Sequence, residues 1–261
     1  MNIASWNINK KQIEDKVYNL IKFYKLDVLF LFEAQNFDKK KFSSFDSNKE
    51  YSFLNLASHK NFVCIYSKVI NINLKTRQSR YCCVEISTTK RNFLFSFIHL
   101  ESQKSSSSDA KSCHEETLRA LRKEIFECKA KYNLKSYFIM GDMNCNPFDK
   151  EMISFSDMNV TLFKRLFIKK PSLEHEKIKY DRLYNPILTM LSEPDFLYGS
   201  YYHYNRCGLY WNAYDQILIN RYALSCFKEA KFLTSIEGQS LLKNLKPDAN
   251  ISDHLPVMVT I

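Results

Sequence analysis

The sequence predicts one α/β domain spanning residues 1–261, in which strands and helices alternate along the chain. A chain of 261 residues can bury a large core, and its content of 45% hydrophobic and 25% charged residues is ordinary for a globular protein. Apolar runs typical of strands alternate with segments in which apolar residues recur at helical spacing. No repeat or linker-like composition divides the sequence, so a single domain is expected.

The elements of the first half follow from this hydrophobic pattern. Residues 2–7 form a short apolar strand, and the helical spacing of apolar residues over 11–25 predicts an amphipathic helix. Residues 26–32 are a nearly continuous apolar run, which is typical of a strand buried on both faces. Three further strands, rich in β-branched and aromatic residues, are expected at 61–67, 81–88 and 92–99.

The second half is less regular. A second amphipathic helix is expected at about 110–132, and residues 137–140 form a short buried strand. Asn146 and the proline after it are expected to start another helix, because proline is tolerated in the first turn. Residues 160–212 show no clear period. Two strands end the chain, at 214–219 and 256–261.

Polar residues of chemically compatible types stand at the ends of these strands. Asn7, Glu33, His99 and Asp142 come at the end of a strand, and Asp215 and His254 come at the start of one. The rim of a sheet can hold a side chain rigidly and still expose it to a substrate. One such residue is ordinary, but six of compatible types predict a catalytic site.

The residue types suit metal-assisted hydrolysis of a phosphate ester. Mg²⁺ prefers a few hard oxygen ligands, so Glu33, assisted by Asn7 and Asp253, is the expected metal set, with Mn²⁺ as an alternative ion. Such a metal neutralises charge on the phosphoryl oxygens. Asp142 is the expected base for the attacking water, and Asn144 would help to orient it.

Two histidines complete the expected catalytic set. His99 and His254 can donate hydrogen bonds to the phosphoryl group or protonate the leaving oxygen, and Asp215 would fix the tautomer of one of them. Each residue alone has a structural explanation, such as turn chemistry for Asp142. Such explanations do not account for the whole set, because every residue would have to be of the right type and in the right order for unrelated reasons.

The same residues lie in motifs that resemble those of the endonuclease/exonuclease/phosphatase (DNase I-like) superfamily. In chain order the motifs are Ser5-Trp6-Asn7, Phe32-Glu33, Gly141-Asp142-Met143-Asn144, Tyr214-Asp215-Gln216 and Ser252-Asp253-His254. They extend over essentially the whole chain, and the Gly-Asp-Met-Asn and Ser-Asp-His elements are the most specific. The resemblance implies a four-layered α/β/β/α sandwich, in which two packed mixed sheets are flanked by helices.

The resemblance also implies a role for each matched residue. Glu33 would bind the metal with Asn7 nearby and Asp253 in support, Asp142 would activate water, Asn144 would hold a phosphate oxygen, and His254, paired with Asp215, would contact the scissile phosphate. The segment ending in His99 resembles the DNase I, sphingomyelinase and deadenylase branches. Members of the abasic-site endonuclease branch tend to have tyrosine there, which argues against that repair activity.

The substrate is predicted less directly. A net charge of +10 attracts polyanions, either nucleic acid or the headgroups of anionic lipids. Tyr204, Arg206 and Trp211 lie in an aromatic stretch before Asp215 and are the candidate substrate contacts. Aromatic rings there would stack on bases, and arginine would bind phosphate. Packing against the second sheet explains the rings equally well, and the same two interpretations apply to His203.

The leading hypothesis is a nuclease or related phosphodiesterase acting on nucleic acid. A phosphatase or phospholipase acting on phosphoinositides or other small phosphoesters is the first alternative. An inactive binding module of the same fold is the second alternative, against which the complete motif set argues. Eight cysteines without the spacing of a zinc site predict free thiols. Without a leader peptide, membrane span or coiled coil, a cytoplasmic monomer is expected.

Overall fold

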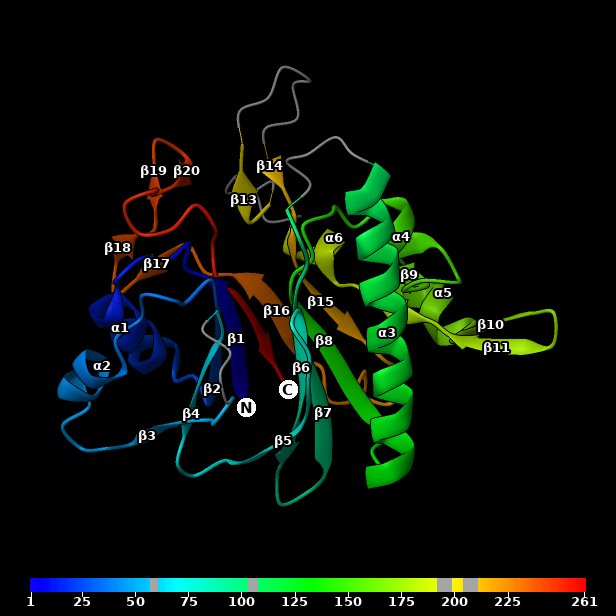
Figure 1. The fold of residues 1–261 in the computed structure, drawn as a ribbon, viewed down its shortest axis with the longest axis horizontal. Coiled ribbons are helices and arrows are strands. Elements are labelled where there is room, and N and C mark those ends of the chain that lie inside the picture. Colours follow the sequence, from blue (N-terminus) through cyan, green and yellow to red (C-terminus); the bar gives the residue numbers. More distant parts are fainter. Residues whose placement is uncertain (57–60, 103–107, 192–198, 204–210) are drawn as a thin grey trace.

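The structure is a computed structural model, and it describes residues 1–56, 61–102, 108–191, 199–203 and 211–261. Two mixed β-sheets pack face to face in the middle of the molecule, and helices cover the outer face of each sheet (Figure 1). The four-layered sandwich that the motifs imply is therefore confirmed. In the described ranges, no helix combines the length and the apolar character needed to cross a membrane.

The first sheet has six strands. Their order across the sheet is β16 (Glu229–Phe232), β21 (Val257–Thr260), β1 (Asn2–Asn7), β2 (Val28–Phe32), β4 (Val63–Ser67) and β3 (Tyr51–Phe53). Strands β1 and β2 are parallel, and Asn7 lies opposite Phe32. Because the carboxyl ends of parallel strands meet at one edge, Asn7 and the residue after β2, Glu33, emerge side by side.

The second sheet has seven strands. Their order is β5 (Asn71–Arg77), β6 (Tyr81–Ser87), β7 (Asn92–His99), β8 (Ser136–Asp142), β15 (Asp215–Ile219), β12 (Leu183–Tyr184) and β9 (Val160–Thr161). Strands β7 and β8 are parallel, with His99 opposite Asp142. Strand β15 runs antiparallel to β8, with Asp215 also opposite Asp142. This register brings three of the predicted residues to one edge of the sheet.

Six helices and four small hairpins complete the described chain. The helices are α1 (Glu14–Tyr24), α2 (Lys39–Phe45), α3 (Ser108–Tyr132), α4 (Lys150–Ile153), α5 (Lys164–Lys169) and α6 (Ile187–Met190). The hairpins are β10 (Ser172–His175) with β11 (Ile178–Asp181), β13 (Tyr201–Tyr202) with β14 (Trp211–Asn212), β17 (Ser235–Ile236) with β18 (Gln239–Ser240), and β19 (Leu242–Lys243) with β20 (Lys246–Pro247). In Figure 1, α1 and α2 lie outside the first sheet and α3 lies outside the second.

Strand β2 shows how the two sheets are joined. Its residues alternate between the two hydrophobic clusters, with Phe30 turned toward the second sheet and Leu31 toward α1 and α2. The strand is buried on both faces, as its unbroken apolar run predicts. The ring of Phe30 stacks on Phe97 of β7, with 4.3 Å between centroids and 8° between planes. Aromatic stacking of this kind fixes the spacing between the sheets.

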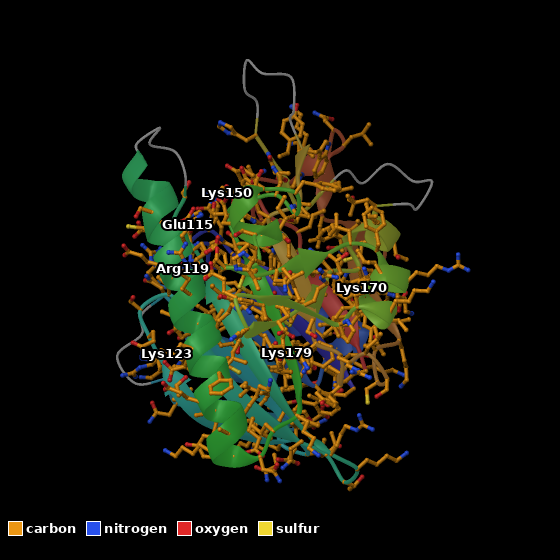
Figure 2. All side chains as sticks on the ribbon, turned by 90° about the vertical axis from the view of Figure 1, so that its right-hand side faces the viewer. Glu115, Arg119, Lys123, Lys150, Lys170 and Lys179 are labelled. Carbon is orange, nitrogen blue, oxygen red and sulfur yellow. The ribbon has the colours of Figure 1, made fainter. Side chains whose placement is uncertain are left out.

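Helix α3 is attached to its surroundings by charged side chains as well as by its apolar face. Glu115 accepts from Arg119 at 3.1 Å and from Lys150 of α4 at 3.2 Å. Figure 2 shows these three side chains together where α3 passes α4. Arg119 also bonds the buried carboxylate of Asp157 at 2.8 Å. These contacts hold the segment that follows the Gly-Asp-Met-Asn motif against α3.

The second half of the chain departs from the expected pattern at α4, and the described part of residues 160–212 forms only short elements. The helix expected to start at Asn146 begins instead at Lys150, because the backbone N–H of Asn146 donates to the Asp149 side chain and forms a turn. Residues 160–212 contain several elements of two to six residues, which are too short to produce a visible hydrophobic period. The seven cysteines in the described ranges are free thiols, as their spacing predicts.

Candidate active site

The two sheets present their polar strand ends to one cleft of about 530 Å³. Six predicted residues line this cleft, namely Asn7, Glu33, Asp142, Asn144, Asp253 and His254. His99 and Asp215 stand directly behind this lining and contact it. The Nε2 atom of His99 lies 3.6 Å from the Glu33 carboxylate and 3.7 Å from that of Asp142. All eight predicted catalytic and metal residues therefore converge at one place.

Asp142 is the centre of the arrangement. Its side chain is only 1% exposed, and its Oδ1 atom accepts from the backbone N–H of Asn144 at 2.9 Å. Its Oδ2 atom accepts from the amide of Asn7 at 3.0 Å and lies 3.7 Å from the Nε2 atoms of both His99 and His254. One carboxylate oxygen thus faces three side-chain nitrogen atoms, and the Asn7 amide is the one within hydrogen-bond distance of it.

His254 and Asp215 form a buried pair that spans the two sheets. The Nδ1 atom of His254 lies 2.8 Å from Oδ2 of Asp215, so Nε2 faces the cleft. The Asp215 backbone N–H donates to the Ser200 hydroxyl. Burial lowers the pKa of His254, but the charges of Asp215 and Asp142 raise it more, to about 10. Burial also raises the pKa of Asp215, against the effect of the histidine charge.

Other residues of the motifs hold these side chains in place. The indole N–H of Trp6 donates to the carbonyl of His254 at 2.9 Å. The hydroxyl of Ser252 donates to the carbonyl of Asn7 at 2.6 Å and accepts from the backbone N–H of His254. The Gln216 amide donates to the carbonyl of Cys145, in the loop after β8. These hydrogen bonds connect the motifs to one another and to the loop after β8.

The backbone is strained where two of these side chains enter the cleft. Glu33 has φ +47° and Asn144 has φ +46°, in the left-handed region that few non-glycine residues adopt. Glu33 redirects the chain immediately after β2, and Asn144 does so two residues after the end of β8. Backbone strain of this kind is retained where the surrounding structure enforces it, and it is common at functional sites.

The donor set fits a hard divalent cation. Four carboxylates, those of Glu33, Asp142, Asp215 and Asp253, meet around the cleft, and Oδ1 of Asp253 is buried without a hydrogen-bond partner among the described residues. Oxygen ligands without internal partners are what Mg²⁺ requires. The ligand atoms of Asp142, Asp215 and His254 also lie within 4.8 Å of one another, but Asp215 already occupies Nδ1 of the histidine.

The side-chain amide of Asn7 connects a backbone N–H to two carboxylates of the site. Its amide oxygen accepts from the backbone N–H of Asn9 at 3.0 Å. Its amide nitrogen consequently turns toward the carboxylates and lies 3.4 Å from Glu33 and 3.0 Å from Asp142. In this geometry Asn7 orients the two carboxylates with respect to each other.

The aromatic stretch divides into two groups. Tyr201 and His203 line the cleft, and the Tyr201 ring packs on His254 with 4.6 Å between centroids. Trp211 instead packs edge-on against Tyr202, with 5.6 Å between ring centroids, and is not among the described residues that line the cleft. The rings of Tyr201 and His203 are therefore placed to stack on a ligand in the cleft, whereas Trp211 packs within the protein. The other two candidate substrate contacts, Tyr204 and Arg206, lie outside the described residues.

Sequence reasoning did not identify Lys10 or Tyr201 as site residues. The ammonium group of Lys10 lies 3.9 Å from the Glu33 carboxylate and lines the cleft. Its position three residues after Asn7 of the Ser-Trp-Asn motif was the available signal. In the sequence, Tyr201 is one of several neighbouring tyrosines. In the structure, an isolated β-bridge between Tyr201 and His254 places it at the site.

Comparison with known proteins supports the same fold. No model of a known protein family matches the chain, and no curated protein matches its sequence. Solved structures do match over 100% of this chain. D. rerio TDP2 in complex with a single-strand DNA product is 14% identical, with 98% of that chain covered and a TM-score of 0.61. The 3′-5′ exonuclease NExo from Neisseria meningitidis is 16% identical, with 99% covered and a TM-score of 0.57.

A third similar structure is the endonuclease domain of TRAS1, a telomere-specific non-LTR retrotransposon. It is 10% identical to this chain, with 97% of that domain covered and a TM-score of 0.55. At these identities the likeness shows the fold. The chain accordingly has the DNase I-like fold that the resemblance of its motifs implies.

Proposed function

We propose that this protein is a metal-dependent phosphodiesterase that hydrolyses nucleic acid, and that residues 1–261 form a single catalytic domain. The observation that carries the proposal is the position of the buried Asp142 carboxylate, 3.7 Å from two histidine Nε2 atoms and beside further carboxylates. That arrangement combines a base for water, proton donors and oxygen ligands, which are the groups that phosphodiester hydrolysis requires.

Glu33 and Asp253 would hold the divalent cation, with Asn7 orienting Glu33. Mg²⁺ suits these oxygen ligands, and Mn²⁺ is the alternative ion. When bound, the ion would neutralise charge that develops on the phosphoryl oxygens. The partly exposed Glu33 carboxylate and the unpartnered oxygen of Asp253 support this assignment.

In the proposed reaction Asp142 accepts a proton from water as the water oxygen bonds to phosphorus. The bond from phosphorus to the leaving oxygen breaks, and His254 supplies the proton that this oxygen takes up. A pKa of about 10 keeps His254 protonated at neutral pH, as a donor must be. His99 would donate a hydrogen bond to a phosphoryl oxygen, and Asn144, which lines the cleft and whose amide nitrogen already donates to the Leu100 carbonyl at 2.9 Å, would donate its second amide hydrogen.

Three features favour nucleic acid as the substrate. The chain carries a net charge of +10, which raises the local concentration of polyanions. The Tyr201 ring beside His254 offers a stacking surface next to the reacting phosphate, as in single-strand binding sites. Two of the similar structures are described as an exonuclease and as an endonuclease domain, and a third contains a DNA product.

The test is a panel of substrates with Mg²⁺ or Mn²⁺, namely single- and double-stranded DNA, RNA and inositol phosphates. We expect cleavage of nucleic acid, and a loss of about 10²–10⁴-fold in turnover for Asp142→Asn, because general-base catalysis contributes about that much. Wild-type protein in EDTA is the control for metal dependence. Release of phosphate from inositol phosphates with nucleic acid intact would instead indicate the phosphatase alternative, and no turnover of any substrate would indicate a binding module.

A further inference from the structure

A second positively charged concavity lies at the opposite end of the second sheet from the catalytic cleft. A cavity of about 920 Å³ is lined by Arg91, Lys135 and Arg221, and an adjoining smaller cavity shares Arg221 and adds Arg182. Tyr222 lines both cavities. We call the two together the basal groove. The amino ends of β7 and β8 and the carboxyl end of α3, which border it, lie at the bottom of Figure 1.

The cations of the basal groove are not neutralised within the described protein. Arg91, Lys135, Arg182 and Arg221 form no ion pair with any described residue. Among the described residues, the guanidinium group of Arg91 bonds the Ser225 hydroxyl, and that of Arg182 bonds the backbone carbonyl of Lys170. These bonds orient the guanidinium groups but leave their charge uncompensated. Such groups bind a ligand that brings its own negative charge.

Acidic side chains are nearly absent from the walls of the groove. Asp181 is the one carboxylate among the described lining residues, and it already pairs with Lys129 at 3.3 Å. Lys179, labelled in Figure 2, lines the smaller cavity and adds a further cation. The potential inside the groove is therefore positive, and its concave shape concentrates the field.

An aromatic ring lies among these charges. The side chain of Tyr222 is 53% exposed and stands where the two cavities meet. An exposed ring between cations is the combination that binds single-stranded nucleic acid, because bases stack on the ring while arginine and lysine bind phosphates. A membrane surface would need a convex apolar face instead, and Tyr222 is the one large exposed apolar side chain among the described residues that line the groove.

We propose that the basal groove binds the backbone and bases of a single-stranded nucleic acid at a site separate from the catalytic cleft. Strand β7 runs from Asn92 at the groove to His99 at the cleft. Eight residues of strand span about 23 Å. A nucleic acid held in the groove therefore stays tethered while another part of the same or a second strand occupies the cleft. The groove lies outside the proposed catalytic machinery and does not depend on the reaction there.

The experiment measures the binding of a fluorescently labelled single-stranded oligonucleotide in EDTA, by anisotropy over a series of salt concentrations. The variant is Arg221→Gln combined with Lys135→Gln. If each side chain neutralises one phosphate, the Kd rises about fifteenfold at about 0.15 M salt, and the slope of log K against log salt becomes shallower by about 1.4. Tyr222→Leu should weaken binding by about fivefold or more without changing that slope.

The matched control is Lys40→Gln combined with Lys49→Gln, which removes the same charge from exposed, unpaired positions around α2. An equal loss of affinity in this control would overturn the proposal, because it would reduce the effect to net charge. So would unchanged oligonucleotide binding in the groove variant, or a loss of binding by that variant only to vesicles containing anionic lipid.

Two further readouts separate this proposal from the proposed function. Hydrolysis of a small chromogenic phosphodiester should be unchanged in the groove variant, because neither substituted residue lines the cleft. A melting temperature equal to that of the wild type would establish that the variant is folded. If the wild type binds oligonucleotide through the groove but never cleaves it, the proposed function fails and the groove stands. If the wild type cleaves oligonucleotide and the groove variant binds it equally well, the groove proposal fails and the proposed function stands.

Discussion

His254 is held as a cation by its neighbours. Burial disfavours a charged imidazole, but Asp215 lies 2.8 Å from one ring nitrogen and Asp142 lies 3.7 Å from the other. The resulting pKa of about 10 lies well above the ordinary value of 6.5. The same ion pair thus orients the ring and makes the stability of the fold depend on pH.

This dependence can be measured with His254→Gln. Below pH 6.5 the histidine is protonated in both folded and unfolded chains, so its contribution to stability is fully present. As pH rises from 6.5 toward 10, the folded protein keeps a proton that the unfolded chain has lost, and the contribution declines. Urea unfolding in EDTA should therefore show a free-energy difference between wild type and variant that shrinks over this range. A constant difference would mean that His254 is neutral in the folded protein.

Most of the site residues were predictable because they end or begin buried strands. Asp142 and Asp215 follow from the apolar runs beside them and from the motifs. Lys10 did not, because its place depends on two successive left-handed residues, Asn9 and Lys10, that turn the chain toward Glu33. Tyr201 was not separable from Tyr202, because only the bridge to His254 decides which ring faces the cleft.

Strand β8 approaches its neighbours unusually closely at Gly141. The residue has φ +140°, and a Cβ atom there would lie 2.1 Å from the carbonyl oxygen of Ile98 on β7 and 2.7 Å from the ring of Phe32 on β2. Glycine in the Gly-Asp-Met-Asn motif therefore allows three strands from both sheets to meet just before Asp142. The motif is a packing requirement as well as a chemical one.

Replacement of Gly141 by alanine should consequently displace the backbone that carries Asp142. We expect Gly141→Ala to lower the free energy of unfolding by about 3 kcal/mol or more, from overpacking and an unfavourable φ. Gly238→Ala is the matched control, because its φ is +81° but no atom lies within 4 Å of the added Cβ. That change should cost only about 1 to 2 kcal/mol, from the left-handed backbone alone. Chemical denaturation of both variants tests the difference, and equal costs would show that the close approach is relieved without strain.

The central strands were predictable and the peripheral elements were not. Strands such as β2 and β7 are buried on both faces, so apolar runs mark them plainly. The hairpin of β13 and β14 has two residues in each strand and carries polar and aromatic residues together. Its place is set by tertiary contacts rather than by local preference. The shifted start of α4 has a local cause instead, because the backbone N–H of Asn146 bonds the Asp149 side chain in a turn that delays the helix.

Across the whole molecule, the two sheets contribute different parts of the site. The proposed metal site draws on three adjacent strands of the first sheet. The proposed ligands Glu33 and Asp253 follow β2 and precede β21, and Asn7, which orients Glu33, ends β1 between those two strands. The proposed base comes from the second sheet, where His99, Asp142 and Asp215 end or begin the adjacent strands β7, β8 and β15. The aromatic layer between the sheets therefore sets the distance from the proposed metal ligands to the proposed base.

This division predicts how Mg²⁺ affects stability. Binding to the folded state alone adds about 2.7 kcal/mol when the ion is present at about 100 times its Kd, and for a chain of this size that corresponds to a rise in Tm of about 5 °C or more. Glu33→Gln removes a proposed ligand from the first sheet, so the rise should be lost. A control variant should change a residue of the second sheet. Gln216→Glu is unsuitable, because the Gln216 side chain bonds the Cys145 carbonyl and the Asn185 amide and its replacement would disturb the fold.

Asp215→Asn is the better comparison, because it changes a carboxylate of the second sheet that faces His254 rather than the proposed metal residues. Its Tm in EDTA will differ from that of the wild type, but Mg²⁺ should still raise it by a similar amount. Differential scanning calorimetry with and without Mg²⁺ measures both shifts. If Asp215→Asn lost the rise in Tm and Glu33→Gln kept it, the ion would be bound by the cluster of Asp142, Asp215 and His254. The second sheet would then supply the carboxylate ligands of the metal, and the proposed base would have to come from the first sheet.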